Sequence, residues 1–178
     1  EADAEQHRPM RTDDLFRLQS MTKPVTSVAL LTLYEQGKFR LSDPLAKYLP
    51  AFKQLRVLKG TGPNGELLLE DPKRPVTIED VFRHTAGFSY GYFTDTPVDH
   101  AYQAAGVRYE ESGSLREFTD KLATMPLLYQ PGTQWHYSFA HEVQARLVEV
   151  LSGMPFDAYC RKVIFEPLGM NDTVFGIP

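Results

Sequence analysis

Residues 15–37 read LFRLQSMTKPVTSVALLTLYEQG and contain the pattern Ser-x-x-Lys at Ser20 and Lys23. After Ser20 the apolar residues recur so as to cover one broad face, and Gly37 is a typical C-terminal stop, so a helix is expected over residues 20–36. The alternation of apolar and polar residues at positions 15–18 predicts a short strand that leads into this helix. The stretch therefore predicts a strand, a turn and a buried helix that begins at a serine.

The spacing of Ser20 and Lys23 has a chemical meaning. Three residues make about one helical turn, which brings the lysine amine next to the serine hydroxyl. Both groups would lie at a helix N-terminus, where unpaired N–H groups and the helix dipole favour developing negative charge. A serine hydroxyl needs a neighbouring base to become a nucleophile, and a lysine can serve when burial or a nearby cation lowers its pKa. Taken alone, the pattern also fits a capping serine beside a solvated lysine.

Composition and charge exclude several classes of function. The chain has 178 residues, 42% of them hydrophobic, which suffices for one compact domain or for a piece of a larger one. The net charge of −4 comes from interspersed acids and bases without a basic stripe, so we expect no nucleic-acid partner. The apolar stretch at 25–33 is too short to span a membrane.

Metal and redox chemistry also find no support in the sequence. Cys160 is the single cysteine, and Cys or His ligands at zinc spacing are absent, so we expect no disulfide, no metal and no cofactor. The chain begins at Glu1 without a signal-type segment, which leaves its cellular compartment open.

Residues 38–178 read as a mostly helical region without repeats or a linker. Capping patterns at Thr77 with Asp80 and at Ser114 with Glu117 each predict a helix start. We expect helices at about 78–84, 115–125 and 138–151, and a shorter one after Pro155. Residues 41–59 favour turns and helical fragments, and 60–75 favour a loop with a brief strand at 66–70.

The segment around Ser20 closely resembles the nucleophile segment of the β-lactamase-related serine hydrolases, which include class C β-lactamases, D,D-peptidases and family VIII carboxylesterases. Similar landmarks follow in the family's order: LSDPLAKYLP at 41–50, VTIED at 76–80 leading to HTAGF at 84–88, and PLGMNDT at 167–173. The resemblance implies an α+β fold of the β-lactamase/D,D-peptidase type, an antiparallel sheet flanked by helices plus a helical region.

Within that fold, the resemblance implies that residues 1–178 form a partial domain, mainly its helical part with few strands. Residues 1–19 would end the N-terminal strands, residues 20–37 would form the nucleophile helix, and residues 38–178 the mostly helical region.

The family's second catalytic motif is Tyr-x-Asn, and its match here is Tyr137-Ser138-Phe139. The resemblance implies that Tyr137 completes a proton relay with Ser20 and Lys23. A lysine ammonium beside a phenol favours the ionised form of the phenol, which can take the serine proton and deliver it to the leaving group. Phe139 replaces the Asn, whose amide can bind a lactam amide. An apolar residue there is expected to suit an acyl or alcohol group, which favours an esterase over a β-lactamase.

The resemblance also implies that parts of the family's domain are missing. The third motif, Lys-Thr-Gly or a Trp- or His-containing equivalent, has no match after Tyr137, and its strand normally supplies an oxyanion-hole N–H. We expect the chain to be truncated at both ends. On this interpretation it is aggregation-prone, or another chain or a second copy completes its sheet.

Gly87-Phe88-Ser89-Tyr90-Gly91 also fits Gly-x-Ser-x-Gly, the nucleophile elbow of α/β-hydrolases. The elbow requires a strand before the serine and a helix after it, whereas we expect a helix before Ser89 and a loop after it. No spacing supports any of three candidate triad partners, namely His100, His136 and His141. Ser89 therefore stays an alternative to Ser20.

Other single residues have two readings. A partly positive imidazole of His84 would interact favourably with the end of its helix, so we expect His84 to be structural. Phe88, Tyr90 and Trp135 would line an acyl pocket or pack in the core.

The leading hypothesis is a serine hydrolase that cleaves small carboxylic esters through an acyl-enzyme on Ser20. The alternatives are an amide hydrolase of the β-lactamase, D,D-peptidase or D-aminopeptidase type with the same machinery, and an inactive member that acts as a binding module.

Overall fold

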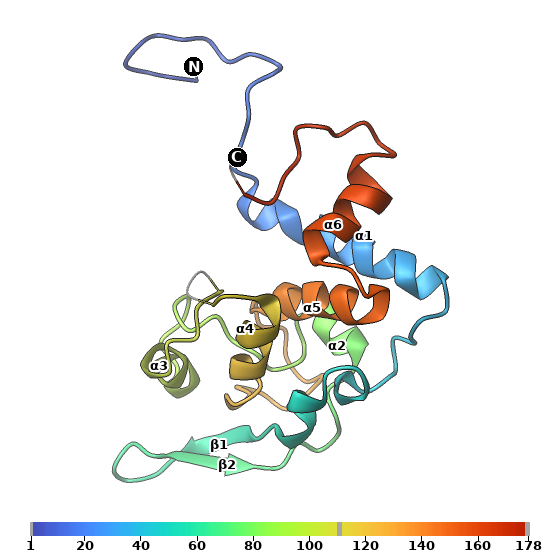
Figure 1. Ribbon diagram of the computed structural model, residues 1–178. Helices are drawn as coiled ribbons and strands as arrows, with labels where there is room; N and C mark the ends of the chain where they lie inside the picture. The colour runs from blue at the N-terminus through green and yellow to red at the C-terminus, as the bar shows by residue number, and fades with distance from the viewer. Residues whose placement is uncertain (1, 110–111, 177–178) are drawn as a thin grey trace.

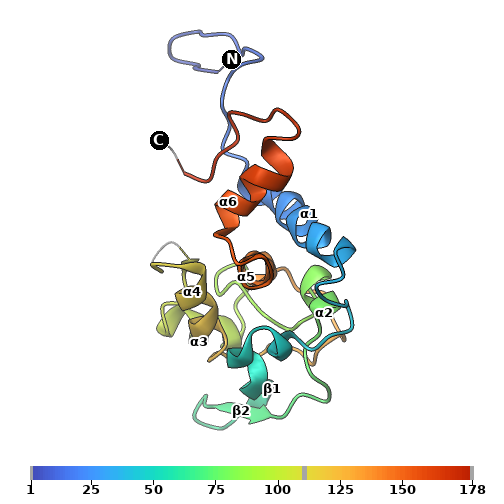
Figure 2. The same cartoon turned by 45° about the vertical axis from the view of Figure 1, so that its right-hand side comes forward.

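The computed structural model describes residues 2–109 and 112–176, and one helix from the C-terminal part of the chain lies at its centre. This helix, α5 (Ala140–Ser152), contacts α1 (Thr22–Glu35), α2 (Ile78–Phe82), α4 (Leu115–Leu122) and α6 (Phe156–Cys160). Figure 1 shows these helices above a small β-hairpin. Figure 2 views α5 nearly end-on, with α1 and α6 on one side and α4 and α3 (Pro97–Ala104) on the other.

Helix α1 follows a short 3-10 turn, η1 (Gln19–Met21), so the predicted helix begins as a 3-10 turn and becomes α-helical at Thr22. Its buried side chains are Thr26, Ala29, Leu30 and Leu33, a spacing that forms one helical face. That face packs against α5, where Ser27 donates a hydrogen bond of 2.8 Å to the buried Gln144. The left-handed Gly37, at φ 70°, ends the helix as predicted.

The strand predicted at residues 15–18 does not form. Leu15 and Phe16 are 79% and 62% exposed, and the segment leaves the helical body as an extended loop (Figure 1). A strand requires a hydrogen-bonded neighbour. Within residues 2–19 the structure has only the isolated bridge between Asp3 and Arg8, so the alternation at 15–18 finds no partner among the described residues.

The hairpin pairs β1 (Val57–Thr61) with β2 (Leu67–Glu70) in antiparallel register. A strand was expected at 66–70, whereas β1 was not, because residues 41–59 read as turns and helical fragments. The 3-10 turns η2 (Leu45–Lys47) and η3 (Pro50–Gln54) do occupy the first part of that stretch. Leu127 anchors β1 by accepting from the Leu58 N–H and donating to the Arg56 carbonyl, both at 2.8 Å. This long-range pairing leaves no local signal in the sequence.

Two predicted helix starts carry their caps. Thr77 and Asp80 form a reciprocal capping box at α2. Ser114 accepts from the Glu117 N–H at the start of α4, but the Glu117 carboxylate accepts from Gly113, so the reciprocal half of the predicted box is absent. Helix α4 ends at Leu122, earlier than expected.

Helices α5 and α6 agree with the predicted helices, and a helix between α2 and α4 was missed. The left-handed Gly153 closes α5, and α6 continues into the π-helical segment η5 (Arg161–Phe165). The missed helix α3 starts from a capping box of Thr96 and Asp99, with a proline in its first turn, where a loop had been expected. None of the described helices combines the length and hydrophobicity needed to cross a lipid bilayer.

Candidate active site

Ser20, Lys23 and Tyr137 come together at the start of α1. The Tyr137 hydroxyl donates to Ser20 Oγ at 2.7 Å, and Lys23 Nζ donates to the same oxygen at 3.4 Å. Lys23 Nζ also lies 4.9 Å from the centre of the Tyr137 ring, within the range of a cation–π contact. Two residues of one helical turn thus meet a residue that follows 117 positions later.

The local backbone explains why Lys23 reaches Ser20. Ser20 lies in the 3-10 turn η1, and Lys23 lies in the first turn of α1. Side chains three positions apart are nearly eclipsed in a 3-10 turn, so the two side chains extend from the same side of the backbone. Ser20 is exposed and Lys23 is half-buried, so the serine oxygen faces solvent while the lysine stem lies against protein.

Tyr137 belongs to an irregular segment that is pinned to residues 84–89 by backbone hydrogen bonds. The Gly132 N–H donates to the Thr85 carbonyl at 2.8 Å, and the His136 N–H donates to the His84 carbonyl at 2.9 Å. The Tyr137 ring lies against the His84 ring with centroids 5.0 Å apart and stacks on the Tyr90 ring at 5.3 Å. These contacts orient the phenol toward Ser20.

His84 is a buried, neutral side chain beneath this site. The Ser138 N–H donates to His84 Nδ1 at 3.2 Å, so this nitrogen acts as an acceptor and carries no proton. Burial lowers the pKa of His84 to about 4, with further lowering from the charges of Lys23 and His136. The expectation of a partly positive imidazole is therefore wrong, because burial opposes the charge at neutral pH.

His141 lies next to His84 and is buried in a similar way. Its ring centroid lies 4.9 Å from that of His84, and burial, His84 and Lys23 lower its pKa to about 3. Its Nδ1 has no hydrogen-bond partner among the described residues. The lysine of the site is thus flanked by two histidines that stay uncharged at neutral pH.

Phe139 does not face the site, contrary to expectation. It is 3% exposed and packs against the rings of Tyr90 and Phe118, with centroids 4.3 Å and 4.9 Å away. The side chain that replaces the family's Asn therefore fills the core and offers no surface to an acyl or alcohol group. The residue near Lys23 that the sequence left undecided is Tyr90, whose ring centre lies 5.5 Å from Lys23 Nζ.

Ser89 lies in a closed polar cluster. It is 1% exposed, its hydroxyl donates to Asp99, and His136 Nε2 lies 3.3 Å from Ser89 Oγ. Asp99 also accepts from Thr94 Oγ1 at 2.5 Å and from the Thr96 N–H at 2.9 Å. Residues 87–91 form no strand-turn-helix, so the nucleophile elbow is absent. The sequence pointed to Ser89 and His136, but Asp99 was not predicted. Its only signal in the sequence is the helix-capping pattern that it forms with Thr96.

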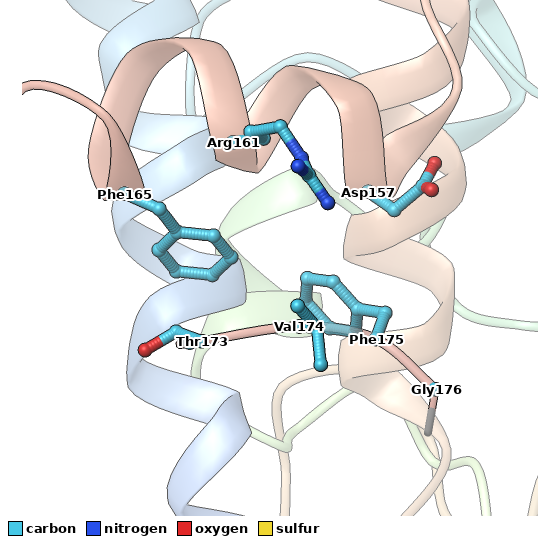
Figure 3. Close-up of a pocket in the computed structure, with 7 residues that line it drawn as sticks. All are labelled: Asp157, Arg161, Phe165, Thr173, Val174, Phe175 and Gly176. Carbon is cyan, nitrogen blue, oxygen red and sulfur yellow. The ribbon is translucent and has the colours of Figure 1, made fainter. Parts of the chain in front are cut away.

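Two of the cavities among the described residues differ in their relation to Ser20. A cavity of about 280 Å³ lies between α6, η5 and residues 173–176, where Arg161 and two phenylalanine rings surround it (Figure 3). None of the three predicted site residues lines it. A second cavity, of about 170 Å³, is lined by Tyr90, Tyr92 and residues of α3, and so borders the ring that stacks on Tyr137.

Metal-ligand clusters are not found near Ser20. Across residues 2–109 and 112–176, no group of three or more His, Cys, Asp or Glu side chains could hold a metal ion.

Comparison with known proteins places this arrangement in a family. Protein Rv1367c of Mycobacterium tuberculosis is 36% identical over 168 residues, which are 94% of this chain and 40% of that protein. Esterase EstB of Burkholderia gladioli is 35% identical over 179 residues, covering 98% of this chain and 42% of the esterase. The chain thus spans about two fifths of the length of the curated relatives it matches.

Solved structures agree with this placement. EstCE1, described as a hydrolase with promiscuous acyltransferase activity, superposes with a TM-score of 0.76 at 29% identity, covering 94% of this chain and 41% of EstCE1. The fold is of the β-lactamase/D,D-peptidase type, and this chain contains mainly its helical part with a two-stranded antiparallel sheet. A profile of the family described as Beta-lactamase matches residues 1–178, and the chain belongs to that family.

Proposed function

We propose that the protein is a serine hydrolase that cleaves carboxylic esters through an acyl-enzyme on Ser20, with Lys23 and Tyr137 as its proton relay. The observation that carries the proposal is the meeting of three groups at one exposed oxygen. Ser20 Oγ lies 2.7 Å from the Tyr137 hydroxyl and 3.4 Å from Lys23 Nζ. The shorter distance lies within the range needed for proton transfer, and the longer one lies just beyond it. In enzymes without bound substrate, catalytic hydrogen bonds are often longer than in the reacting complex.

The reaction follows from these positions. The reaction starts from the Tyr137–Lys23 pair with one proton fewer, as phenolate beside ammonium or phenol beside neutral amine. As Ser20 Oγ attacks the ester carbonyl carbon, its proton passes to this pair. The same pair then delivers a proton to the leaving alcohol oxygen as the carbon–oxygen bond breaks, which leaves the acyl group on Ser20. Water repeats the sequence on the acyl-enzyme and releases the carboxylic acid.

Esters are favoured over lactams by two observations. A buried Phe139 stands where the family motif has an Asn whose amide can bind a lactam amide, so this donor and acceptor are lost. EstB, which is 35% identical, carries the name esterase. Both observations support an ester substrate for the intact protein.

The decisive experiment is covalent labelling of the nucleophile. The intact protein is treated separately with p-nitrophenyl butyrate and a fluorophosphonate, and intact mass and peptide mapping locate the adduct. We expect the adduct on Ser20, loss of adduct and turnover in Ser20→Ala, and retention of both in Ser89→Ala. An adduct on Ser89, or full turnover by Ser20→Ala, would refute the proposal.

Tyr137→Phe tests the proton relay separately from the fold. The phenylalanine keeps the ring contacts with His84 and Tyr90 and removes only the hydroxyl. We expect kcat to fall about 10²- to 10⁴-fold, because this is the rate enhancement that general acid–base catalysis usually contributes. KM should change little. Tyr34→Phe, which alters an exposed tyrosine on α1, is the matched control.

Two further outcomes would select the alternatives. Ser20-dependent labelling by a fluorescent penicillin without ester turnover would indicate an amide hydrolase. Absence of every adduct on a folded protein would indicate a binding module.

A further inference from the structure

We propose that the aromatic shelf, defined as the exposed side chains of Tyr92, Phe93 and Trp135, is the subsite for the leaving alcohol and selects alcohols that carry a planar aromatic group. The inference rests on the proposed function of Ser20 and Tyr137, and it assigns a substrate class to that site.

The shelf is built from two separate segments that meet at Tyr137. The Phe93 ring centroid lies 5.8 Å from that of Tyr137, and the Trp135 ring is stacked on it at 6.3 Å with an interplanar angle of 26°. Tyr92 extends the shelf through Phe93, with ring centroids 4.7 Å apart. Phe93 and Trp135 therefore border the ring of Tyr137, and Tyr92 extends the shelf from Phe93.

These rings face solvent, unlike most aromatic side chains of the chain. Tyr92, Phe93 and Trp135 are 59%, 62% and 67% exposed, whereas Phe88, Phe118 and Tyr102 are at most 1% exposed. Clustered, exposed apolar side chains mark binding surfaces more often than isolated ones do. Because this cluster borders Tyr137, the proposed proton donor, the substrate is the occupant that its position favours.

The position next to Tyr137 assigns the shelf to the alcohol side of the ester. A proton donor must lie within hydrogen-bond distance of the oxygen that it protonates. If Tyr137 protonates the leaving oxygen, the group attached to that oxygen extends from the Tyr137 hydroxyl, and the rings around Tyr137 border it. The acyl group lies on the opposite side of the carbonyl carbon.

A planar group suits the geometry of the shelf. The exposed Trp135 ring lies nearly parallel to the Tyr137 ring, at 26°, so the shelf offers a flat ring face. Aromatic groups gain from offset stacking on such faces beyond the gain from burial.

Three butyrate esters of primary alcohols test the selectivity in the intact protein. Ethyl, 2-cyclohexylethyl and 2-(2-naphthyl)ethyl butyrate share the acyl group and have unactivated leaving groups. We expect kcat/KM to be highest for the naphthyl ester. It should exceed kcat/KM of the cyclohexyl ester about tenfold, which is the contribution expected from one or two aromatic contacts. We also expect 2-(2-naphthyl)ethanol to inhibit more strongly than 2-cyclohexylethanol.

Variants then assign the preference to the shelf. Phe93→Leu and Trp135→Leu keep an apolar side chain but remove the ring, and each should lower the naphthyl-to-cyclohexyl ratio by roughly two- to tenfold. Leu168→Ala, at a side chain that is 69% exposed outside the shelf, is the control and should leave the ratio unchanged. The acyl-side pair, ethyl 2-naphthylacetate and ethyl cyclohexylacetate, should show no change in ratio in either shelf variant.

The outcomes separate this inference from the proposed function. Ser20-dependent turnover with equal rates for the naphthyl and cyclohexyl esters would overturn the inference alone. A shift of the acyl-side ratio in place of the alcohol-side ratio would overturn the assignment to the alcohol. Lack of Ser20-dependent turnover on every ester would overturn the proposed function and the inference with it.

Discussion

The replacement His84→Asn should make the protein less sensitive to acid. His84 is 8% exposed, and burial with the nearby charges lowers its pKa from 6.5 to about 4. In the unfolded chain the imidazole binds a proton below about pH 6.5, whereas in the folded chain it stays neutral until about pH 4. Stability is therefore lost as the pH falls through this window, because the unfolded state binds more protons.

The magnitude follows from the displacement of the pKa. Each unit corresponds to about 1.4 kcal/mol, so the shift from 6.5 to about 4 amounts to roughly 3 kcal/mol, lost progressively over that pH range. Asparagine does not titrate, tolerates the left-handed backbone of His84 at φ 55°, and can accept from the Ser138 N–H. The variant should thus lose the slope of about 1.4 kcal/mol per pH unit that His84 contributes.

Urea unfolding at pH 7, 6, 5 and 4.5 measures this difference. The free energy of unfolding of the wild type should fall more steeply than that of His84→Asn, and His141 should keep part of the slope in both proteins, since its own pKa is lowered to about 3. His100→Asn is the matched control, because the His100 side chain is 62% exposed. Parallel curves for the wild type and His84→Asn would refute the burial of a neutral imidazole.

Three further substitutions follow from the packing. Ser89→Ala should cost about 1–3 kcal/mol in urea unfolding, because buried Asp99 loses a donor, and it should retain Ser20-dependent labelling. Gly87→Ala should lower the free energy of unfolding by at least about 2 kcal/mol more than Gly153→Ala. Both glycines have positive φ, but a Cβ at Gly87 would meet the Tyr129 carbonyl, whereas a Cβ at Gly153 would have open space. Equal decreases in Tm for the two variants would contradict this. Arg74→Met should cost about 1–2 kcal/mol at pH 7 by unpairing buried Asp80, discounted for the 44% exposure of Arg74. Hydrogen bonds from Arg74 and Thr77 outweigh burial and lower the pKa of Asp80, so this cost should shrink below about pH 4.

The fold could be predicted where local signals decide the structure. Helix α1 follows from the spacing of its apolar residues and from Gly37, and α2 follows from the capping box at Thr77. Strand β1 was missed although it pairs with β2 across a turn that contains Asn64-Gly65, a local hairpin signal. Its further hydrogen bonds to Leu127, which lies far along the chain, left no such signal. Helix α3 was missed although Thr96 and Asp99 carry the signal, because the glycine and aromatic residues before it favoured a loop.

The three site residues were predicted from the Ser-x-x-Lys spacing and from a resemblance, and the structure brings their side chains together. Their surroundings could not be predicted. Phe139 turns into the core because it can pack against Tyr90 and Phe118, and the charge state of His84 depends on burial by residues from several segments. Both are consequences of tertiary packing, which a short motif does not encode.

Ser89 and Ser20 show how two serines with polar partners differ in reactivity. Although burial raises the pKa of Asp99, hydrogen bonds from Ser89, Thr94 and Thr96 outweigh it and lower the pKa. An anion held in this way does not take the Ser89 proton, and both Ser89 and Asp99 are buried. Ser20 is instead exposed, and its Oγ lies 2.7 Å from the Tyr137 hydroxyl and 3.4 Å from Lys23 Nζ, the two groups proposed to take its proton.

The Ser89 cluster has a different consequence for the site. Its members flank the loop that carries Tyr92 and Phe93, with Ser89 before the loop and Thr94 and Thr96 after it, and all three donate to Asp99. One buried carboxylate therefore fixes both ends of the loop. Loosening it in Asp99→Asn should lower the naphthyl-to-cyclohexyl ratio of kcat/KM while the adduct still forms on Ser20, and an unchanged ratio would show that the shelf is held by other contacts.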